Sequence, residues 1–296
     1  MVDPSGSARM WLPRMSLAQC VKCIMVRDTR MLPGGRQHAW TWLPASPCCA
    51  LTWFFEGCSE QMDLAGGDAR VIGRYEGLVF AGSHRRPTAF RYPEPVHGFM
   101  ILFMPDALSL LTGMTPSDWT DRIVPAQDVI GQVPWLMALC EEVSHAADDD
   151  ARVQCIEAVL DPMWQAVRPT EAMGSHYFED WMQGLSLRAS QTGLGRSIRQ
   201  VERRIKQWTG HPLRELRGIS RSERTFMDAL AAEESGELNW ATLAIDTGHA
   251  DQSHLSRQSR RLTGFAPEEF RRRIREDEGF WAYRLWGFSE ARRPVP

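Results

Sequence analysis

Basic side chains gather in three short stretches in the second half of this 296-residue chain. Guanidinium and ammonium groups bind phosphates, and an Arg side chain can also pair in bidentate fashion with guanine. Residues 176–296 contain 20 basic and 17 acidic residues, a net charge of +3, whereas residues 1–175 have a net charge of −6. Because +3 is small, local grouping is the stronger indication of a nucleic-acid surface. The three stretches are Arg196, Arg199, Arg203, Arg204 and Lys206; then Arg257, Arg260 and Arg261; and then Arg271, Arg272, Arg273 and Arg275.

Two of these stretches lie in an internal repeat. Residues 197–210, SIRQVERRIKQWTG, align without a gap with residues 251–264, DQSHLSRQSRRLTG, at an offset of 54. Both copies begin with a capping residue and end in Thr-Gly, and apolar Val201 corresponds to Leu255. Each copy follows a short helical segment and a glycine-containing turn. The pattern predicts a duplicated helix-turn-helix, the unit whose second helix lies in the major groove.

The outward-facing positions of the two predicted recognition helices are polar. Arg can pair with guanine, Gln with adenine, and Glu can accept a hydrogen bond from cytosine. Lys206, Arg260 and Arg261 lie nearer the helix ends and are expected to contact phosphates. The alternative is a solvated helix face, which is the usual meaning of such charges. The predicted DNA-binding residues are Ser197, Arg199, Glu202, Arg203, Lys206, Gln252, Ser253, His254, Ser256, Arg257, Arg260 and Arg261.

The elements that position these residues are predicted to be helices throughout residues 177–296. Ser197 with Gln200, and Ser220 with Glu223, match the capping-box pattern that begins a helix. The helix from Ser220 is expected to have about 15 residues and a length of about 22 Å, and to hold the two units rigidly apart. Recognition helices about 34 Å apart would meet successive major-groove turns on one face of DNA.

The first half of the chain consists of short apolar segments separated by turn residues. This pattern is typical of a β-sandwich or a small barrel. Helical spacing follows over residues 107–111, Val133–His145 and Ala151–Val167. The predicted fold class is therefore α+β, with a leader at 1–17, a sensor or dimerisation domain at 18–167, a linker at 168–176 and an all-α double helix-turn-helix domain at 177–296. The predicted strands are Val21–Val26, Trp40–Leu43, Ala50–Phe55, Val71–Ile72, Leu78–Ala81 and Phe99–Phe103.

The second copy of the repeat resembles the AraC/XylS family of bacterial transcriptional regulators. The resemblance is carried by Leu243-Ala244, by residues 247–257 (TGHADQSHLSR), by residues 261–267 (RLTGFAP) and by Phe270-Arg271, while the first copy is looser. Two positions depart from the family pattern. His249 stands where an aromatic residue is usual, and Ser259 stands where a core Phe is usual, so we expect looser packing around Ser259. Residues 280–286 extend past the usual end and are predicted to pack back on this domain, with a partner surface as the alternative.

This resemblance implies a sequence-specific transcriptional regulator whose first half is a cupin-like barrel that senses an effector. Effector or partner binding would change how the two halves are held, and so change DNA affinity. The implied partners are double-stranded DNA, a small-molecule effector, RNA polymerase and a second copy of the chain in a homodimer. Trp40, Trp42, Trp53 and Phe55 could line an aromatic effector pocket, with plain core packing as the alternative.

Two other classes of protein stay open at this point. One is a metal-dependent cupin-type enzyme fused to a DNA-binding domain, and the other is a ligand-independent regulator that acts through a protein partner. His38, His84 and His97 each stand alone, whereas a cupin enzyme normally needs a His-x-His with a nearby carboxylate. No Ser/His/Asp arrangement, P-loop or dinucleotide fingerprint is found. We therefore predict no catalytic residue, no metal and no cofactor.

Seven cysteines occur in the chain, an odd number that argues against a disulfide framework. Cys20 and Cys23 with Cys48 and Cys49 could bind zinc or sense oxidation, but adjacent residues of a strand point to opposite faces and hinder joint ligation. The longest apolar segments are too short to cross a bilayer, and no signal-peptide pattern begins the sequence. These features predict a cytoplasmic protein with reduced thiols.

Overall fold

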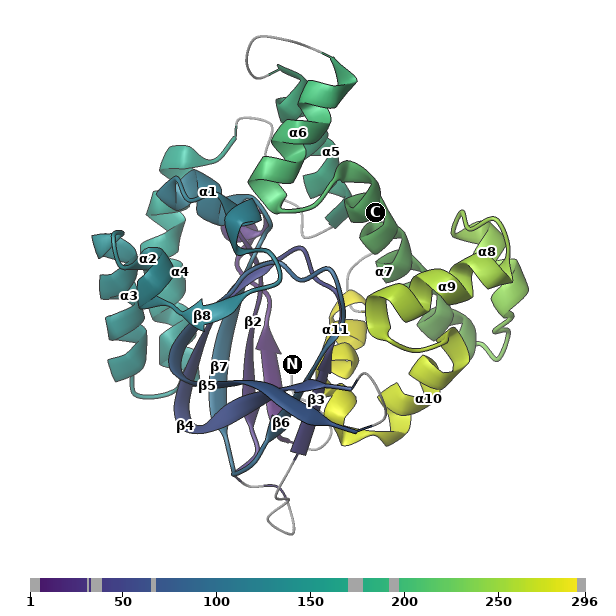
Figure 1. Cartoon of the computed structure of the whole chain (residues 1–296), viewed down its shortest axis with the longest axis horizontal. Coiled ribbons are helices and arrows are strands. Elements are labelled where there is room, and N and C mark those ends of the chain that lie inside the picture. Colours follow the sequence, from purple (N-terminus) through teal and green to yellow (C-terminus); the bar gives the residue numbers. More distant parts are fainter. Residues whose placement is uncertain are drawn as a thin grey trace.

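The computed structural model describes residues 6–30, 32, 39–64, 68–169, 178–191 and 197–291, with the side chains of 287–291 outside this description. An antiparallel sheet lies at the centre of the molecule (Figure 1). Helices of residues 107–167 lie along one side of the sheet, and helices of residues 178–291 lie over one end and along the other side. The predicted linker 168–176 falls largely outside the described residues, as does His38.

Eight strands within the described residues form the sheet, in the order β1-β2-β7-β4-β5-β8, with β6 pairing to both β3 and β4. The predicted segments Val71–Ile72 and Leu78–Ala81 are two parts of one strand, and the other predicted strands are confirmed. The strands are β1 (Ala8–Trp11), β2 (Val21–Asp28), β3 (Ala39–Leu43), β4 (Cys49–Asp63), β5 (Arg70–Ala81), β6 (Thr88–Tyr92), β7 (His97–Phe103) and β8 (Ile123–Pro125).

Strand β4 changes one of its partners halfway along. Its first part lies between β7 and β5, and residues 60–62 pair with β6 instead of β7. The bend lies at Gly57, which has a φ of +74° and where a Cβ would lie 2.4 Å from the carbonyl oxygen of Pro95. The sheet folds over, but within the described residues the edge strands β1 and β8 do not pair. The predicted barrel is thus corrected to an open, bent sheet, since a barrel requires its edges to join.

The first strand corrects the predicted leader at 1–17. Residues 8–11 pair with β2 along their whole length, and Ala8 and Met10 are buried at 1% and 3% exposure. A strand of four residues with only two buried side chains gives too short an alternation to distinguish it from a loop. The domain that contains the sheet therefore begins no later than Ala8.

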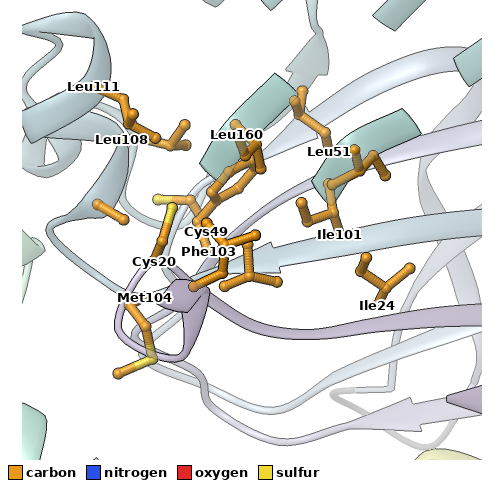
Figure 2. Close-up of a cluster of buried hydrophobic side chains, with 14 of the residues drawn as sticks. Cys20, Ile24, Cys49, Leu51, Ile101, Phe103, Met104, Leu108, Leu111 and Leu160 are labelled. Carbon is orange, nitrogen blue, oxygen red and sulfur yellow. The ribbon is translucent and has the colours of Figure 1, made fainter. Parts of the chain in front are cut away.

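Four helices cover one face of the sheet and bury the main core. They confirm the helical prediction for residues 133–145 and 151–167. Figure 2 shows Leu51 and Ile101 of the sheet close to Leu160 of the covering layer, and all three are at most 2% exposed. The helices are α1 (Ala107–Thr112), α2 (Gln127–Ile130), α3 (Pro134–His145) and α4 (Asp149–Val167).

The second half is helical, as predicted, but its long connecting helix begins earlier than expected. Pro212 is extended and starts the helix at Leu213, so Ser220 lies inside it and does not cap it. The helix has 22 residues, which gives it a length of about 33 Å. The helices are α5 (Phe178–Gln191), α6 (Ile198–Thr209), α7 (Leu213–Glu234), α8 (Trp240–Asp246), α9 (Gln252–Thr263), α10 (Pro267–Glu276) and α11 (Trp281–Ala291).

Helix α11 packs against the sheet, on the side away from α1–α4 (Figure 1). Trp281 is fully buried among Met10, Met25 and their neighbours, and its Nε1 donates a hydrogen bond of 2.9 Å to Thr41 Oγ1. Phe280, just before α11, and Tyr283, in the first turn of α11, pack on α10 as predicted. The C-terminal tail therefore packs on both halves of the molecule, and only its second contact agrees with the prediction.

Candidate DNA-binding surface

The two copies of the repeat fold into recognition helices with the same boundaries. Helices α6 and α9 both contain 12 residues and begin 54 residues apart. Ser197 and Gln200 form the predicted capping box, and Asp251 caps α9 by accepting a 2.6 Å hydrogen bond from the His254 N–H. Side chains that satisfy the first backbone N–H groups fix where each helix starts, and so which residues face outward.

The Thr-Gly pairs that end the two helices also share one geometry. Thr209 Oγ1 donates to the carbonyl of Ile205 at 2.7 Å, and Thr263 Oγ1 donates to that of Ser259 at 2.8 Å. The following glycines, Gly210 and Gly264, have φ values of +76° and +90°, which L side chains rarely adopt. The sequence repeat is therefore a structural repeat down to its caps.

Most of the predicted DNA-binding side chains are exposed. Two of them are half-buried: His254 accepts from the Ala250 N–H at 3.3 Å, and Ser256 accepts from Arg260 at 3.0 Å. The opposite faces of the helices are buried through Ile205 in α6 and through Leu255 and Leu262 in α9. The predicted DNA-binding residues that are exposed are Ser197, Arg199, Glu202, Arg203, Lys206, Gln252, Ser253, Arg257, Arg260 and Arg261.

The three basic stretches differ in their ionic partners. Within the described residues, Arg199, Arg203, Lys206 and Arg257 form no ion pair. Every arginine of the third stretch, on α10, pairs with a carboxylate. Those pairs are Arg271 with Glu233 and Glu268, Arg272 with Glu276, Arg273 with Glu269 and Asp277, and Arg275 with Glu233. The positive charge left for a polyanion therefore lies on the two recognition helices.

His249 occupies the position at which the resembled family usually has an aromatic residue. Its ring is 4% exposed, lies 3.3 Å from Thr225 Oγ1 through Nε2, and meets the His254 ring edge to face at 5.3 Å. Burial lowers the pKa of His249, helped by the positive charge of Arg221. A neutral imidazole thus serves here as a small aromatic core residue.

A cavity of about 170 Å³ lies on the concave face of the sheet. Its lining is mostly apolar, with Met25 and Met100 among the side chains, and its polar groups include Lys22 and Arg27. Ala282 and Trp286 of α11 form part of the wall. The helical half of the chain therefore contributes directly to a cavity in the sheet half.

None of the four predicted pocket aromatics lines this cavity, because side chains alternate along a strand. Trp53 and Phe55 face the α1–α4 layer, where Trp53 donates to the carbonyl of Cys140 at 3.1 Å. Trp42 packs on Phe265 and Phe280 of the helical half, and it stacks on Trp40. The intervening residues line the cavity instead: Thr41, Leu43, Ala50, Thr52 and Phe54. The positions of strands β3 and β4 were predicted well, but the side chains that face the cavity were not.

His84, His97, Cys48 and Cys49, which were considered for metal binding, each have another environment. His97 contacts Asp149 at 3.1 Å, and His84 contacts the carbonyl of Gly82 at 2.7 Å. Cys49 lies in the main core while Cys48 lines the cavity, and burial raises the pKa of both thiols to about 12. Among the described residues, no three His, Cys, Asp or Glu side chains form a group that could hold a metal ion.

Sequence reasoning missed Ile198, the first residue of α6. Its side chain is 80% exposed, directly after the Ser197 cap and beside Arg199. An apolar residue this exposed on a polar helix face is unusual, and it could contact a thymine methyl group in the major groove. The signal in the sequence was an isoleucine outside the apolar spacing of residues 201, 205 and 208.

Two family models match the chain. Residues 192–273 match a helix-turn-helix domain, and residues 9–125 match a domain of unknown function. No curated protein matches the sequence. No helix among the described residues is both long and apolar enough to cross a membrane.

Several solved structures resemble the chain over most of its length. Apo ToxT K231A from Vibrio cholerae is 12% identical, covers 83% of this chain and 95% of its own, and has a TM-score of 0.35. ToxT bound to an unsaturated fatty acid is 11% identical, covers 79% and 93%, and has a TM-score of 0.33. The AraC-like transcriptional activator CuxR is 16% identical, covers 95% and 91%, and has a TM-score of 0.28.

The repeat geometry and the matched domain together define the class of this domain. Residues 192–273 form a helix-turn-helix domain, and two capped recognition helices within it present unpaired basic side chains. The chain therefore contains a helix-turn-helix DNA-binding domain.

Proposed function

We propose that this chain is a transcriptional regulator of the AraC type and that it reads two successive major-groove segments with the exposed faces of α6 and α9. The observation that supports this most directly is the contrast in ionic partners. Arg199, Arg203, Lys206 and Arg257 of the recognition helices form no ion pair with the described residues, whereas every arginine of the third basic stretch, on α10, pairs with a carboxylate. A structural surface gains from pairing its charges, but a polyanion site needs them available. In the complex, DNA phosphates would be the ionic partners of these side chains.

The residues divide into base and phosphate contacts by their place on each helix. Arg199 and Arg203 on α6, and Arg257 on α9, lie on the exposed face of the first two turns and are proposed to read bases. The proposed phosphate contacts lie closer to the helix ends: Lys206, Arg260 and Arg261. Helix α7, about 33 Å long, has a length comparable with the ~34 Å repeat of DNA, which suits units on one duplex face.

Replacing both Arg203 and Arg257 with alanine tests this proposal. The whole chain would first be used to retain genomic fragments, and one retained fragment would then be titrated by fluorescence anisotropy. Each lost guanine contact is expected to cost about 1–3 kcal/mol, and binding should weaken most for specific sequence. The matched control is Arg272→Ala, on exposed Arg272 that already pairs with Glu276 at 2.9 Å, and it should bind as wild type. Wild-type affinity in the double variant would refute the contact assignment.

We further infer that the cavity on the concave face of the sheet takes a small, largely apolar effector. Its apolar lining supports this, as does its wall of Ala282 and Trp286 from the helical half. A molecule in the cavity would touch both halves at once, so occupancy would alter how the DNA-binding helices are held. In this proposal the sensor domain ends with α4 and the DNA-binding domain begins with α5.

Indole, a compact apolar probe, tests the effector cavity by calorimetric titration of the whole chain. Met100 lies on β7 and lines the cavity, so Met100→Trp should fill it and weaken indole binding by about tenfold or more. The variant should still bind the retained DNA fragment, which serves as the control for folding. Indole binding that is unchanged in Met100→Trp would refute this assignment while leaving the DNA-contact proposal intact.

A further inference from the structure

A second cavity lies in the second helix-turn-helix unit, against recognition helix α9. It has a volume of about 100 Å³ and is lined by side chains of α7, α8, α9 and α10. Its apolar lining includes Phe226, Leu255, Leu262, Phe270 and Ile274. It shares no lining residue with the cavity of the sheet.

The internal repeat explains why the second unit has this space. Ser259 lines the cavity and lies 54 residues after Ile205, which is fully buried in the core of the first unit. The serine hydroxyl donates a 2.8 Å hydrogen bond to the carbonyl of Phe265, in the loop after α9. The polar group is thus satisfied by the backbone, and no large apolar side chain takes the place that Ile205 takes in the other copy.

The lining indicates the chemistry of an occupant. Apolar cavities bind small apolar molecules, and an engineered one of about 150 Å³ lined by Leu, Ile and Phe binds benzene. Ser222 Oγ, from α7, is buried at the wall without a hydrogen-bond partner among the described residues, so it can donate or accept one bond. The charged lining residues are already engaged with each other, because Glu233 pairs with both Arg271 and Arg275. An ionic ligand would therefore find no free counter-charge.

We propose that this cavity is a second small-molecule site, for a compact uncharged molecule of about one aromatic ring with a single hydroxyl group. The ring would occupy the space next to Ser259, and the hydroxyl would hydrogen-bond to Ser222 Oγ. Because α9 forms one wall, the occupant would sit directly behind a recognition helix. This site is independent of the effector cavity proposed for the sheet.

Phenol and benzene are the probes, titrated into the whole chain by calorimetry. We expect phenol to bind the wild type, and Ser259→Ile, which restores the residue of the first copy, to weaken that binding by about tenfold or more. The same variant should raise Tm, since it fills a void. Ser222→Ala should weaken phenol binding but leave benzene binding unchanged, because only phenol uses the hydroxyl.

Three results would overturn the proposal: absence of phenol binding to the wild type, unchanged phenol binding in Ser259→Ile, and equal losses of phenol and benzene in Ser222→Ala. Unchanged binding in Ser259→Ile together with loss in Met100→Trp would place phenol in the sheet cavity instead. If Ser259→Ile does not fold, Ala229→Leu fills the same cavity from α7, where Ala229 is 5% exposed.

Discussion

Asp149, at the start of α4, joins the covering helices to the sheet through three side chains. Its carboxylate accepts from Arg9 of β1 at 2.7 Å, from Arg152 of its own helix at 2.8 Å, and lies 3.1 Å from His97 of β7. Burial opposes its ionisation, but the hydrogen bonds from His97, Arg9 and Arg152 outweigh burial and lower the pKa of Asp149 to about 2. This residue therefore makes the packing of α4 on the sheet dependent on pH.

Stability should fall with acid through this group. The folded pKa lies below the unfolded value of about 3.9, so the stabilisation of about 2 kcal/mol is present above about pH 4 and is lost towards about pH 2. Asp149→Asn should lower the free energy of unfolding by about that amount at neutral pH, with a difference that shrinks in acid. Urea titrations at several pH values measure this. Asp150→Asn, at an exposed neighbour, is the control, and equal effects from both variants would contradict the prediction.

Single residues also show where prediction from sequence stops. The alternation of side chains along β3 and β4 could be predicted. Which of the alternating side chains face the helices and which face the cavity depends on helices that lie later in the chain. Trp53 and Phe55 were the residues predicted to line a pocket, yet Phe54 between them lines the cavity. By contrast, the exposed face of α6 was predictable, because Val201, Ile205 and Trp208 mark its buried side within the helix itself.

At the scale of elements, α11 and the turn before it connect the two halves through ionic as well as apolar contacts. Arg27 of β2 is 1% exposed and pairs with Glu278, just before α11, at 2.5 Å. Lys22, also on β2, lies over the ring of Trp286 at 4.8 Å. These contacts surround Trp281, so its indole is the centre of the joint between sheet and helical half.

Trp281→Ala should therefore destabilise the protein strongly. Loss of a fully buried indole is expected to cost about 3–5 kcal/mol, whereas Trp281→Phe, which keeps most of the volume but loses the bond to Thr41, should cost clearly less. Calorimetric Tm values of the two variants compare these costs. Equal Tm values for the alanine and phenylalanine variants would show that the indole contributes no packing energy to this joint.

Elements with strong local signals were predictable, and those set by tertiary contacts were not. Both recognition helices were located by their caps and apolar spacing, to within a residue of their observed ends. The start of α7 was misplaced because Ser220 and Glu223 imitate a capping box inside a helix that Pro212 begins. Strand β1 was missed because its pairing with β2, and not its own pattern, makes it a strand.

On the scale of the whole molecule, both helix-turn-helix units contact the sheet domain. Arg188 of α5 and Trp181 bind the carboxylate of Asp106 beside α1, in the first unit. In the second unit, the backbone N–H of Ala45 donates to the carbonyl of Leu262 on α9 at 2.8 Å. A rearrangement of the sheet domain can therefore reach either recognition helix through direct contacts. None of these contacts could be predicted from the sequence, since their partners lie far apart in the chain.

The docking of α11 also bears on how the chain is made. Ser7 hydrogen-bonds to Glu278, 271 residues away, and Met10 and Met25 are covered by Trp281 and Leu285. A ribosome releases the first strands long before it adds residues 281–285, so an apolar patch of the nascent sheet stays uncovered until those residues have emerged. Contacts of such long sequence separation form late and slowly. Chains that stop short of residue 281 would keep that patch exposed and would be prone to aggregate.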